Sequence, residues 1–162
     1  MEVVSAIAVV TLNKPLNLEH LQEFILDSVL QKTNISCLKY RLQPENRYIV
    51  FYKTGKFLIT GRNVLDEKDS IVERVMKLIK ASGIEITVDN VKICNIVAKD
   101  SIYLSEPLDT IYERMEQKNS EYEPEQFPAL IYKKWNVTFL IFQTGSIIIT
   151  GAKDIESLQQ GL

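Results

Sequence analysis

Two stretches of eight residues, TGKFLITG at 54–61 and TGSIIITG at 144–151, are close copies of each other. Five of the eight positions are identical, and the two stretches start 90 residues apart. The same offset aligns residues 7–8 with 97–98 and Leu18 with Leu108. The chain therefore reads as two tandem repeats, 1–90 and 91–162. Because no Gly/Ser linker or low-complexity segment divides them, we expect one continuous structural unit.

Each repeat follows the same predicted order: a strand, a helix, three strands and a last helix. In the first repeat the bounds are 3–12, 18–31, 37–42, 47–53, 56–61 and 66–82, with Gly83 as the stop. In the second repeat they are 91–99, 108–118, 129–134, 137–143, 146–151 and 154–162. The last of these is about two turns long, so we expect this helix to be cut short. Hairpin turns are predicted at Thr54-Gly55 and Thr144-Gly145, and the fold class is α+β.

Composition and charge exclude several classes of protein. The chain has 162 residues, of which 46% are hydrophobic and 25% charged, as is typical of a folded domain. No apolar run reaches about 18 residues, and the first residues carry no basic leader, so neither a membrane span nor a signal peptide is expected. Two cysteines, Cys37 and Cys94, are too few for a disulfide framework. A net charge of −2 excludes a protein that coats nucleic acid with positive charge, but not a specific binder.

The strands predict a sheet that is apolar on both faces. Side chains alternate between faces, so Phe139, Ile141, Ile147 and Ile149 can form one core, as can Ile49, Phe51, Phe57 and Ile59. The opposite parity is also mostly apolar: Leu140, Phe142, Ile148 and Thr150, and Val50, Tyr52, Leu58 and Thr60. In a chain of this size the helices can cover only one face. The second face is therefore either a binding surface or covered by a second molecule or the opposite half.

Three blocks in the second repeat carry a family resemblance: YEPEQFPALIY at 122–132, LIF at 140–142 and TGAK at 150–153. In this order and spacing they resemble the TATA-box-binding protein family of archaea and eukaryotes, whose motif runs YEPE-x-FPG-L-x-Y-R, LIF-x-SGK and TGAK. The resemblance implies a pseudo-twofold saddle, with a curved antiparallel sheet of about ten strands and helices on the convex face. It implies that the concave face sits on the minor groove of DNA. The resemblance covers both repeats and is close only in the second.

In the second repeat the resemblance assigns a role to each matching residue. Phe127 and Phe142 match the pair of phenylalanines that wedge between base steps. Asn95 and Thr150 match residues that contact minor-groove acceptors. The remaining matches are apolar contacts to the groove floor (Val97, Leu130, Leu140, Ile148), cations that reach phosphates (Lys133, Lys153) and the segment offered to transcription factor B (Glu123, Glu125, Gln126).

The first repeat departs from the family pattern. Ser5 stands where the central asparagine is expected, and the two wedge positions fall at Ile35 and Tyr52. The block at 60–63 reads TGRN and lacks the lysine of TGAK. The counterparts that fit the pattern are Ile7, Arg41, Val50, Leu58 and Thr60. We therefore expect weaker or asymmetric bending of DNA, with the better-formed kink at the second repeat's end.

The resemblance implies a general transcription factor that binds and bends TATA-like promoter DNA, recruits transcription factor B and joins the RNA polymerase pre-initiation complex. The alternative is a diverged module that keeps the acidic segment, binds DNA weakly and modulates the initiation machinery. Catalysis is not expected, because the chain has one histidine and shows no catalytic or metal-binding spacing. No cofactor is expected. A homodimer through a sheet surface is one option, and the expected location is cytoplasmic in an archaeon (at the nucleoid) or nuclear in a eukaryote.

Overall fold

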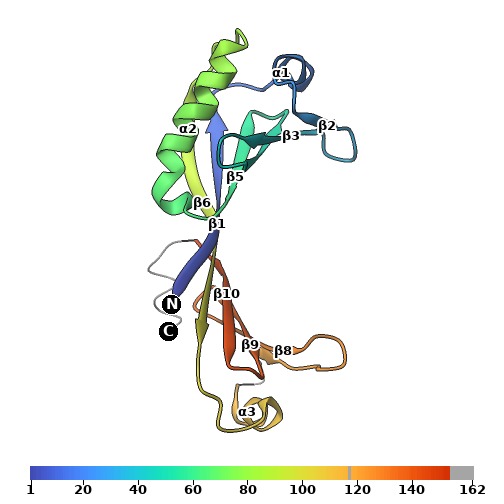
Figure 1. The fold of residues 1–162 in the computed structure, drawn as a ribbon. Coiled ribbons are helices and arrows are strands. Elements are labelled where there is room, and N and C mark those ends of the chain that lie inside the picture. The colour runs from blue at the N-terminus through green and yellow to red at the C-terminus, as the bar shows by residue number, and fades with distance from the viewer. Residues whose placement is uncertain (117, 154–162) are drawn as a thin grey trace. The chain divides into compact units, whose positions relative to one another are not determined.

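The computed structural model describes residues 1–116 and 118–153 (Figure 1). Ten strands pair in one antiparallel sheet, in the order β2-β3-β4-β5-β1-β6-β10-β9-β8-β7, which confirms the α+β class. No helix of the described residues is long and apolar enough to cross a membrane. The elements in chain order are β1 (Glu2–Leu12), α1 (Leu18–Phe24), β2 (Val29–Gln31), β3 (Cys37–Leu42), β4 (Arg47–Tyr52), β5 (Lys56–Gly61), α2 (Val64–Ala81), β6 (Val88–Ser101), α3 (Leu108–Arg114), β7 (Ser120–Glu121), β8 (Ala129–Lys134), β9 (Val137–Phe142) and β10 (Ser146–Ala152).

The chain divides into two compact units. One holds Ala6–Ile93, and the other holds Met1–Ser5 together with Cys94–Leu162. The long strands β1 and β6 each run from one unit into the other. In the first unit β5 pairs with β1 and β4, and in the second unit β10 pairs with β6 and β9. The internal repeat of the sequence is therefore also a repeat of strand pairing.

The core of the first unit lies between its sheet and α2. All four predicted core residues of β4 and β5 (Ile49, Phe51, Phe57 and Ile59) are fully buried. The rings of Phe51 and Phe57 lie 5.7 Å apart between centroids. Helix α2 buries Ile71, Val75 and Ile79, which are spaced four residues apart and so share one side of the helix. Burial of these side chains is the main stabilising contribution to this unit.

The helix-facing side of the second unit is less covered by the described residues. Phe139 and Ile149 are buried as predicted, whereas Ile141 and Ile147 are only half-buried. These four side chains line an apolar groove of about 430 Å³ together with Tyr132 and Trp135. The helix predicted over 154–162 lies outside the described residues.

The predicted helix over 18–31 is wrong beyond Phe24. Ile25 already has an extended backbone, with φ −92° and ψ 94°, and the Ser28 hydroxyl donates to its carbonyl oxygen at 2.6 Å. This local bond competes with helical hydrogen bonding. Residues 29–31 instead form β2, where Val29 pairs with Lys39 of β3. The apolar spacing predicted a helix because pairing with a strand ten residues away leaves no local signal.

The predicted helix over 108–118 ends early in the same way. Helix α3 stops at Arg114, and the short strand β7 follows at Ser120. Its N-cap residue is Pro107, and Asp109 lies in its first turn. The backbone N–H of Leu108 donates to Oε1 of Gln143, at 2.9 Å. A side chain from beyond β9 thus satisfies the helix end.

Both predicted hairpin turns are confirmed. Gly55 and Gly145 have φ of +95° and +91°, a conformation that glycine adopts without steric cost. Their N–H groups donate to the carbonyl oxygens of Tyr52 and Phe142. Their own carbonyls accept from Leu12 in the first unit and Ile102 in the second, each at 2.8 Å. The identical glycines of the two repeats therefore have identical hydrogen-bonding roles.

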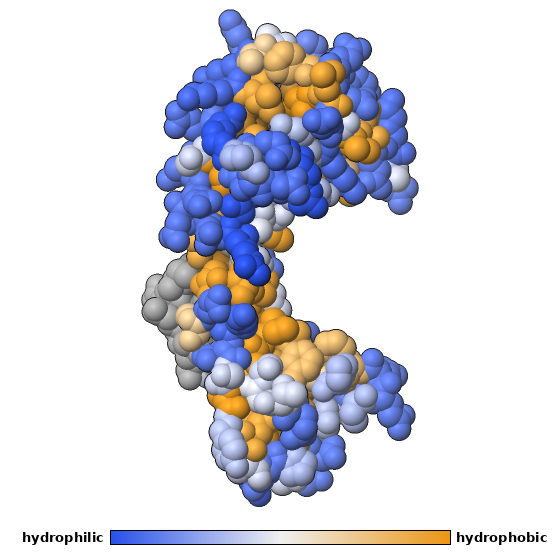
Figure 2. All heavy atoms as spheres, in the orientation of Figure 1, coloured by the Kyte–Doolittle hydropathy of each residue, from blue (hydrophilic) through white to orange (hydrophobic). Residues whose placement is uncertain are grey.

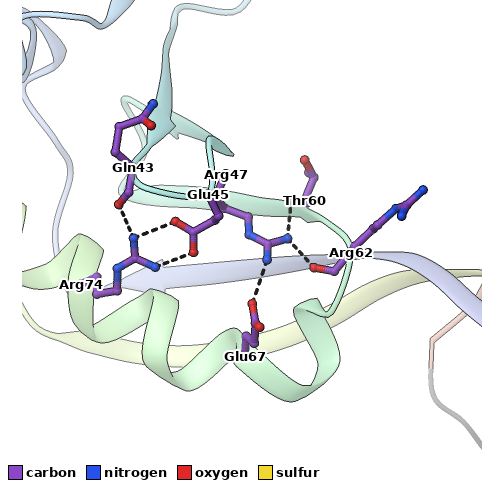
Figure 3. A network of polar contacts seen from close by, with 7 residues as sticks. All are labelled: Gln43, Glu45, Arg47, Thr60, Arg62, Glu67 and Arg74. Atoms are coloured by element: carbon purple, nitrogen blue, oxygen red, sulfur yellow. Dashed lines mark hydrogen bonds and ion pairs between the residues drawn. The ribbon is translucent and has the colours of Figure 1, made fainter.

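The hairpin between β3 and β4, whose turn is longer than that between β8 and β9, is tied to α2 by two arginines (Figure 3). Arg47, which is 8% exposed, donates to the carboxylate of Glu67 at 2.9 Å and to the backbone oxygen of Arg62 at 2.5 Å. A third, longer contact reaches the backbone oxygen of Thr60 at 3.4 Å. One buried guanidinium therefore joins β4, the end of β5 and the first turn of α2.

The second arginine of this network is Arg74, on α2. It binds both carboxylate oxygens of Glu45, at 2.7 and 2.8 Å, and also donates to the backbone oxygen of Gln43. The bidentate bond from Arg74 lowers the pKa of Glu45 to about 2. Glu45 therefore remains charged in all but strongly acidic solution.

Candidate nucleic-acid interface

In the second unit, strand pairing lines up the predicted contact residues on one face of the sheet. Leu140 of β9 lies between Ile131 of β8 and Ile148 of β10. All three are half-buried, while the neighbours of opposite parity, such as Phe139 and Ile149, are buried. Figure 2 shows that hydrophobic residues reach the surface of both units. This row is therefore an apolar surface that the described part of the chain leaves partly open.

Phe127 and Phe142 meet at one end of this row. Their ring centroids lie 6.4 Å apart at an interplanar angle of 62°, an edge-on arrangement that aromatic rings favour. Phe127 is 40% exposed, although it is large and apolar. Its position is set by the turn that precedes β8, where the N–H of Phe127 donates to the carbonyl of Glu123 at 2.9 Å. The structure thus brings the two predicted wedge residues together.

Asn95 and Thr150 meet at the other side of the same face. The Oδ1 atom of Asn95 accepts the N–H of Gly151 at 2.7 Å, and its Nδ2 lies 3.5 Å from Oγ1 of Thr150. Here β10 has an irregularity: Ile149 pairs with Ala98, but the next pair is Ala152 with Ile96. Two residues of β10 therefore face one residue of β6, Val97, which defines a β-bulge.

The predicted cationic and acidic residues lie around this face. Lys133 and Lys153 are exposed, and Lys133 pairs with Thr138, so it shares the face of Ile131. Glu123, Glu125 and Gln126 are exposed in the loop between β7 and β8. Because this loop also positions Phe127, the acidic segment and the wedge pair are neighbours.

The first unit has a comparable face with different end residues. Leu58 lies between Val9 and Val50, and Ile7 pairs with Thr60. Val50 is buried at 5% exposure, and Tyr52 is half-buried. Ile35 is 68% exposed in the loop between β2 and β3. The face is again apolar, but an aliphatic side chain and a tyrosine stand at its wedge positions.

Arg41 is held beside this face by a tyrosine. Its guanidinium carbon lies 4.5 Å from the centroid of the Tyr48 ring, within the range of a cation–π interaction. Arg41 is exposed and pairs with Tyr48 across β3 and β4. A positively charged group is therefore kept at the edge of the apolar face.

Comparison with known proteins identifies the family. A family model described as transcription factor TFIID, or TATA-binding protein (TBP), matches residues 1–82 and 90–162. The chain belongs to the TATA-binding protein family. The two matched segments correspond to the two repeats of the sequence. The family resemblance drawn from the three blocks of the second repeat is thereby confirmed.

Archaeal TATA-box-binding proteins are among the relatives. That of Sulfolobus acidocaldarius is 34% identical over 150 residues, which cover 91% of this chain and 75% of the relative. That of Archaeoglobus fulgidus is 27% identical, and the match covers 100% of this chain and 90% of the relative. Among solved structures, Methanococcus jannaschii TBP matches with a TM-score of 0.84 at 27% identity, over 99% of this chain and 92% of that one. The TATA-binding protein fold therefore accounts for both repeats.

One predicted contact residue needs correction within this family framework. Leu130 is completely buried and pairs with Ile141, which lies on the helix-facing side of the sheet. It therefore cannot touch a molecule bound to the opposite face. Ile131, the next residue, pairs with Leu140 and lies in the contact row. The register between β8 and β9, which the sequence alone does not show, decides which of the two residues shares the face of Leu140.

Proposed function

We propose that the chain is a general transcription factor that binds A·T-rich promoter DNA in the minor groove. The observation that carries this proposal is the half-exposed apolar row in the second unit, with the Phe127–Phe142 pair at its end. Sugars and the groove floor can replace water against such a surface. The relatives named TATA-box-binding protein support the same assignment.

Bending of the DNA follows from the exposed aromatic pair. An apolar side chain inserted between two base pairs unstacks them at a cost of a few kcal/mol, which is offset when the bent duplex covers more protein surface. Phe127 and Phe142 present two such side chains side by side. In the first unit Ile35 is exposed and can wedge, whereas the Tyr52 hydroxyl needs a polar partner. The proposed kink is therefore stronger at the second repeat's end.

Direct readout would come from Asn95 and Thr150, whose polar groups lie beside the apolar row. In the minor groove A·T and T·A pairs present nearly the same acceptors, so discrimination is mainly of A·T from G·C. Lys133, Lys153 and Arg41 are exposed cations that would contact phosphates, which adds affinity without sequence preference. Sequence-dependent deformability adds further selectivity.

Recruitment of a partner is assigned to the exposed acidic segment. Glu123, Glu125 and Gln126 lie in one loop, and its carboxylates are free of ion pairs within the described residues. We assign this loop to transcription factor B, and through it to the RNA polymerase pre-initiation complex. Its charge matches a basic partner surface, which steers association more than it adds affinity.

The test measures binding and bending together. A short duplex with an A·T-rich centre carries one dye at each end and is titrated with the chain at several salt concentrations, with and without transcription factor B. Energy transfer that rises with the chain alone supports a DNA-bending factor. A rise only when transcription factor B is present supports a factor that depends on its partner.

The absence of energy transfer would favour a second function, that of a modulator which binds DNA weakly. The first unit lacks an aromatic wedge pair at Ile35 and Tyr52, which is the observation that motivates a weakly binding modulator. Retained binding to transcription factor B with no rise in energy transfer would support that modulator. The charge-reversing pair Glu123→Lys and Glu125→Lys should abolish the contribution of transcription factor B, while binding of DNA by the chain alone should be retained or strengthened by the added positive charge.

A further inference from the structure

The bulge in β10 fixes the orientation of the Asn95 side chain. A backbone N–H can only donate, so the atom of Asn95 that faces the Gly151 N–H at 2.7 Å must be the amide oxygen. Ambiguity between the oxygen and nitrogen of the amide is thereby removed. The Nδ2 group points toward Thr150 Oγ1 and has a second N–H left over. Asn95 therefore presents its remaining Nδ2 N–H to a bound molecule as a donor, while its oxygen is held on the Gly151 N–H.

Gly151 is the residue that makes this possible. It belongs to the pair of β10 residues that face a single residue of β6, and its φ is +88°. An extra residue in one strand frees its N–H from the regular ladder. That freed N–H is the group that holds Asn95. Gly151 is thus a positioning residue, which acts on a ligand only through the Asn95 amide.

The described residues of the first repeat have neither the bulge nor the asparagine. The register between β1 and β5 is continuous from Ala6 paired with Gly61 to Thr11 paired with Lys56, so no bulge interrupts these residues. The counterpart of Asn95 is Ser5, by the offset of 90 residues. A serine hydroxyl both donates and accepts and rotates to suit its partner. Ser5 of the first repeat can therefore hydrogen-bond to the minor-groove edge of either an A·T or a G·C pair.

We infer that the two repeats read DNA with different stringency: the second rejects a G·C pair, and the first tolerates one. In the minor groove G·C adds the N2 amine, a donor, to the acceptors that A·T pairs also show. The fixed donor of Asn95 has no partner on that amine, whereas Ser5 can accept from it. The inference rests on the proposed minor-groove binding and adds to it a preferred orientation on asymmetric sites.

The test uses the full chain and four duplexes that differ only beside the centre of an A·T-rich site. One has A·T pairs throughout, one has a G·C pair in one half, one has G·C in both halves, and one has inosine·C in both. Inosine lacks the N2 amine and so shows the minor-groove edge of an A·T pair. Binding is measured by fluorescence anisotropy at one fixed salt concentration.

We expect the first G·C pair to weaken binding much less than the second. One G·C pair weakens binding by less than about threefold, because the chain turns its first repeat to that half, and two weaken it by about tenfold or more. Inosine·C in both halves leaves binding within about twofold of A·T, since the amine is absent. A first G·C pair that costs as much as the second overturns the inference, as does an inosine duplex that binds as weakly as G·C. Failure to bind the all-A·T duplex would instead refute the proposed function itself.

The variant Asn95→Ser tests whether the Asn95 amide causes the loss of affinity for G·C pairs. In Asn95→Ser the second repeat carries the residue of the first, so the penalty for two G·C pairs falls below about threefold, relative to the variant's own A·T binding. Asn90→Ser, an exposed asparagine on the same strand, is the matched control and keeps the full penalty. Thermal melting confirms that both variants fold. A penalty that Asn95→Ser leaves unchanged would contradict the role of the amide.

Discussion

At the scale of single residues, the molecule depends on glycines with left-handed backbones. Gly145 and Gly83 have nearly the same φ, +91° and +95°, but different surroundings. A methyl group added to Gly145 would overlap the backbone carbonyl oxygen of Ile102, whereas one added to Gly83 meets nothing within 4 Å. The two positions therefore separate backbone strain from steric overlap.

We predict that Gly145→Ala destabilises the fold by about 2–4 kcal/mol, because backbone strain of about 1–2 kcal/mol adds to the overlap with Ile102. Gly83→Ala is the matched control and should cost only the strain, about 1 kcal/mol. Urea denaturation followed by circular dichroism gives both values. Equal losses in the two variants would show that overlap with the Ile102 carbonyl has no effect.

At the scale of elements, the hairpin between β3 and β4 is fastened to α2 by the ion pair of Glu45 and Arg74. The folded-state pKa of Glu45 is about 2, below its ordinary value of 4.5. A carboxyl with a lowered pKa stabilises the fold above its ordinary pKa and loses that contribution as the pH falls toward the folded-state value. Because the Glu45 side chain is 35% exposed, solvent screening keeps the contribution small.

We predict that Glu45→Gln lowers the free energy of unfolding by about 1 kcal/mol or less at pH 7, through loss of the charged bidentate bond. The difference from the parent chain should shrink between pH 4.5 and pH 2, where the parent carboxyl takes up its proton. Denaturant titrations across this pH range test it. Glu73→Gln, in the more exposed pair with Lys77, is the control and should change stability by less than about 0.5 kcal/mol. A difference that persists unchanged at pH 2 would rule out the ion pair as its cause.

At the scale of the whole molecule, the two repeats share a fold and differ in what their open faces present. The second repeat offers an aromatic pair and a fixed amide, and the first repeat offers Ile35, Tyr52 and the Ser5 hydroxyl. Lysines also lie on both faces, where Lys39 pairs with Val50 and Lys99 pairs with Ile148. We therefore expect the two repeats to act unequally on a bound duplex.

We predict that Phe127→Ala weakens binding to an A·T-rich duplex by about tenfold and reduces bending, because a partly exposed wedge of this size contributes about 1–2 kcal/mol. Tyr52→Ala should have a smaller effect on the bend angle, since this position is the weaker wedge. Phe24→Ala removes a phenylalanine of similar exposure (43%) on α1 and should leave binding unchanged. Circular-permutation gels measure the position and size of each kink. Equal kinks at both ends of the parent complex would contradict the asymmetry.

The sequence by itself determined the repeat, the family, the central strands of each repeat and both hairpin turns. These signals are local: alternation with period two, an apolar stripe in α2 and a glycine at each turn can be read within about ten residues. Only the tertiary structure decided where α1 and α3 end, because β2 and β7 are held by pairing with strands that local spacing does not reveal. It also decided the site in detail. Leu130 and Ile131 exchanged roles through the register of β8, and the bulge that orients Asn95 exists only because β10 pairs with a strand fifty residues earlier in the chain.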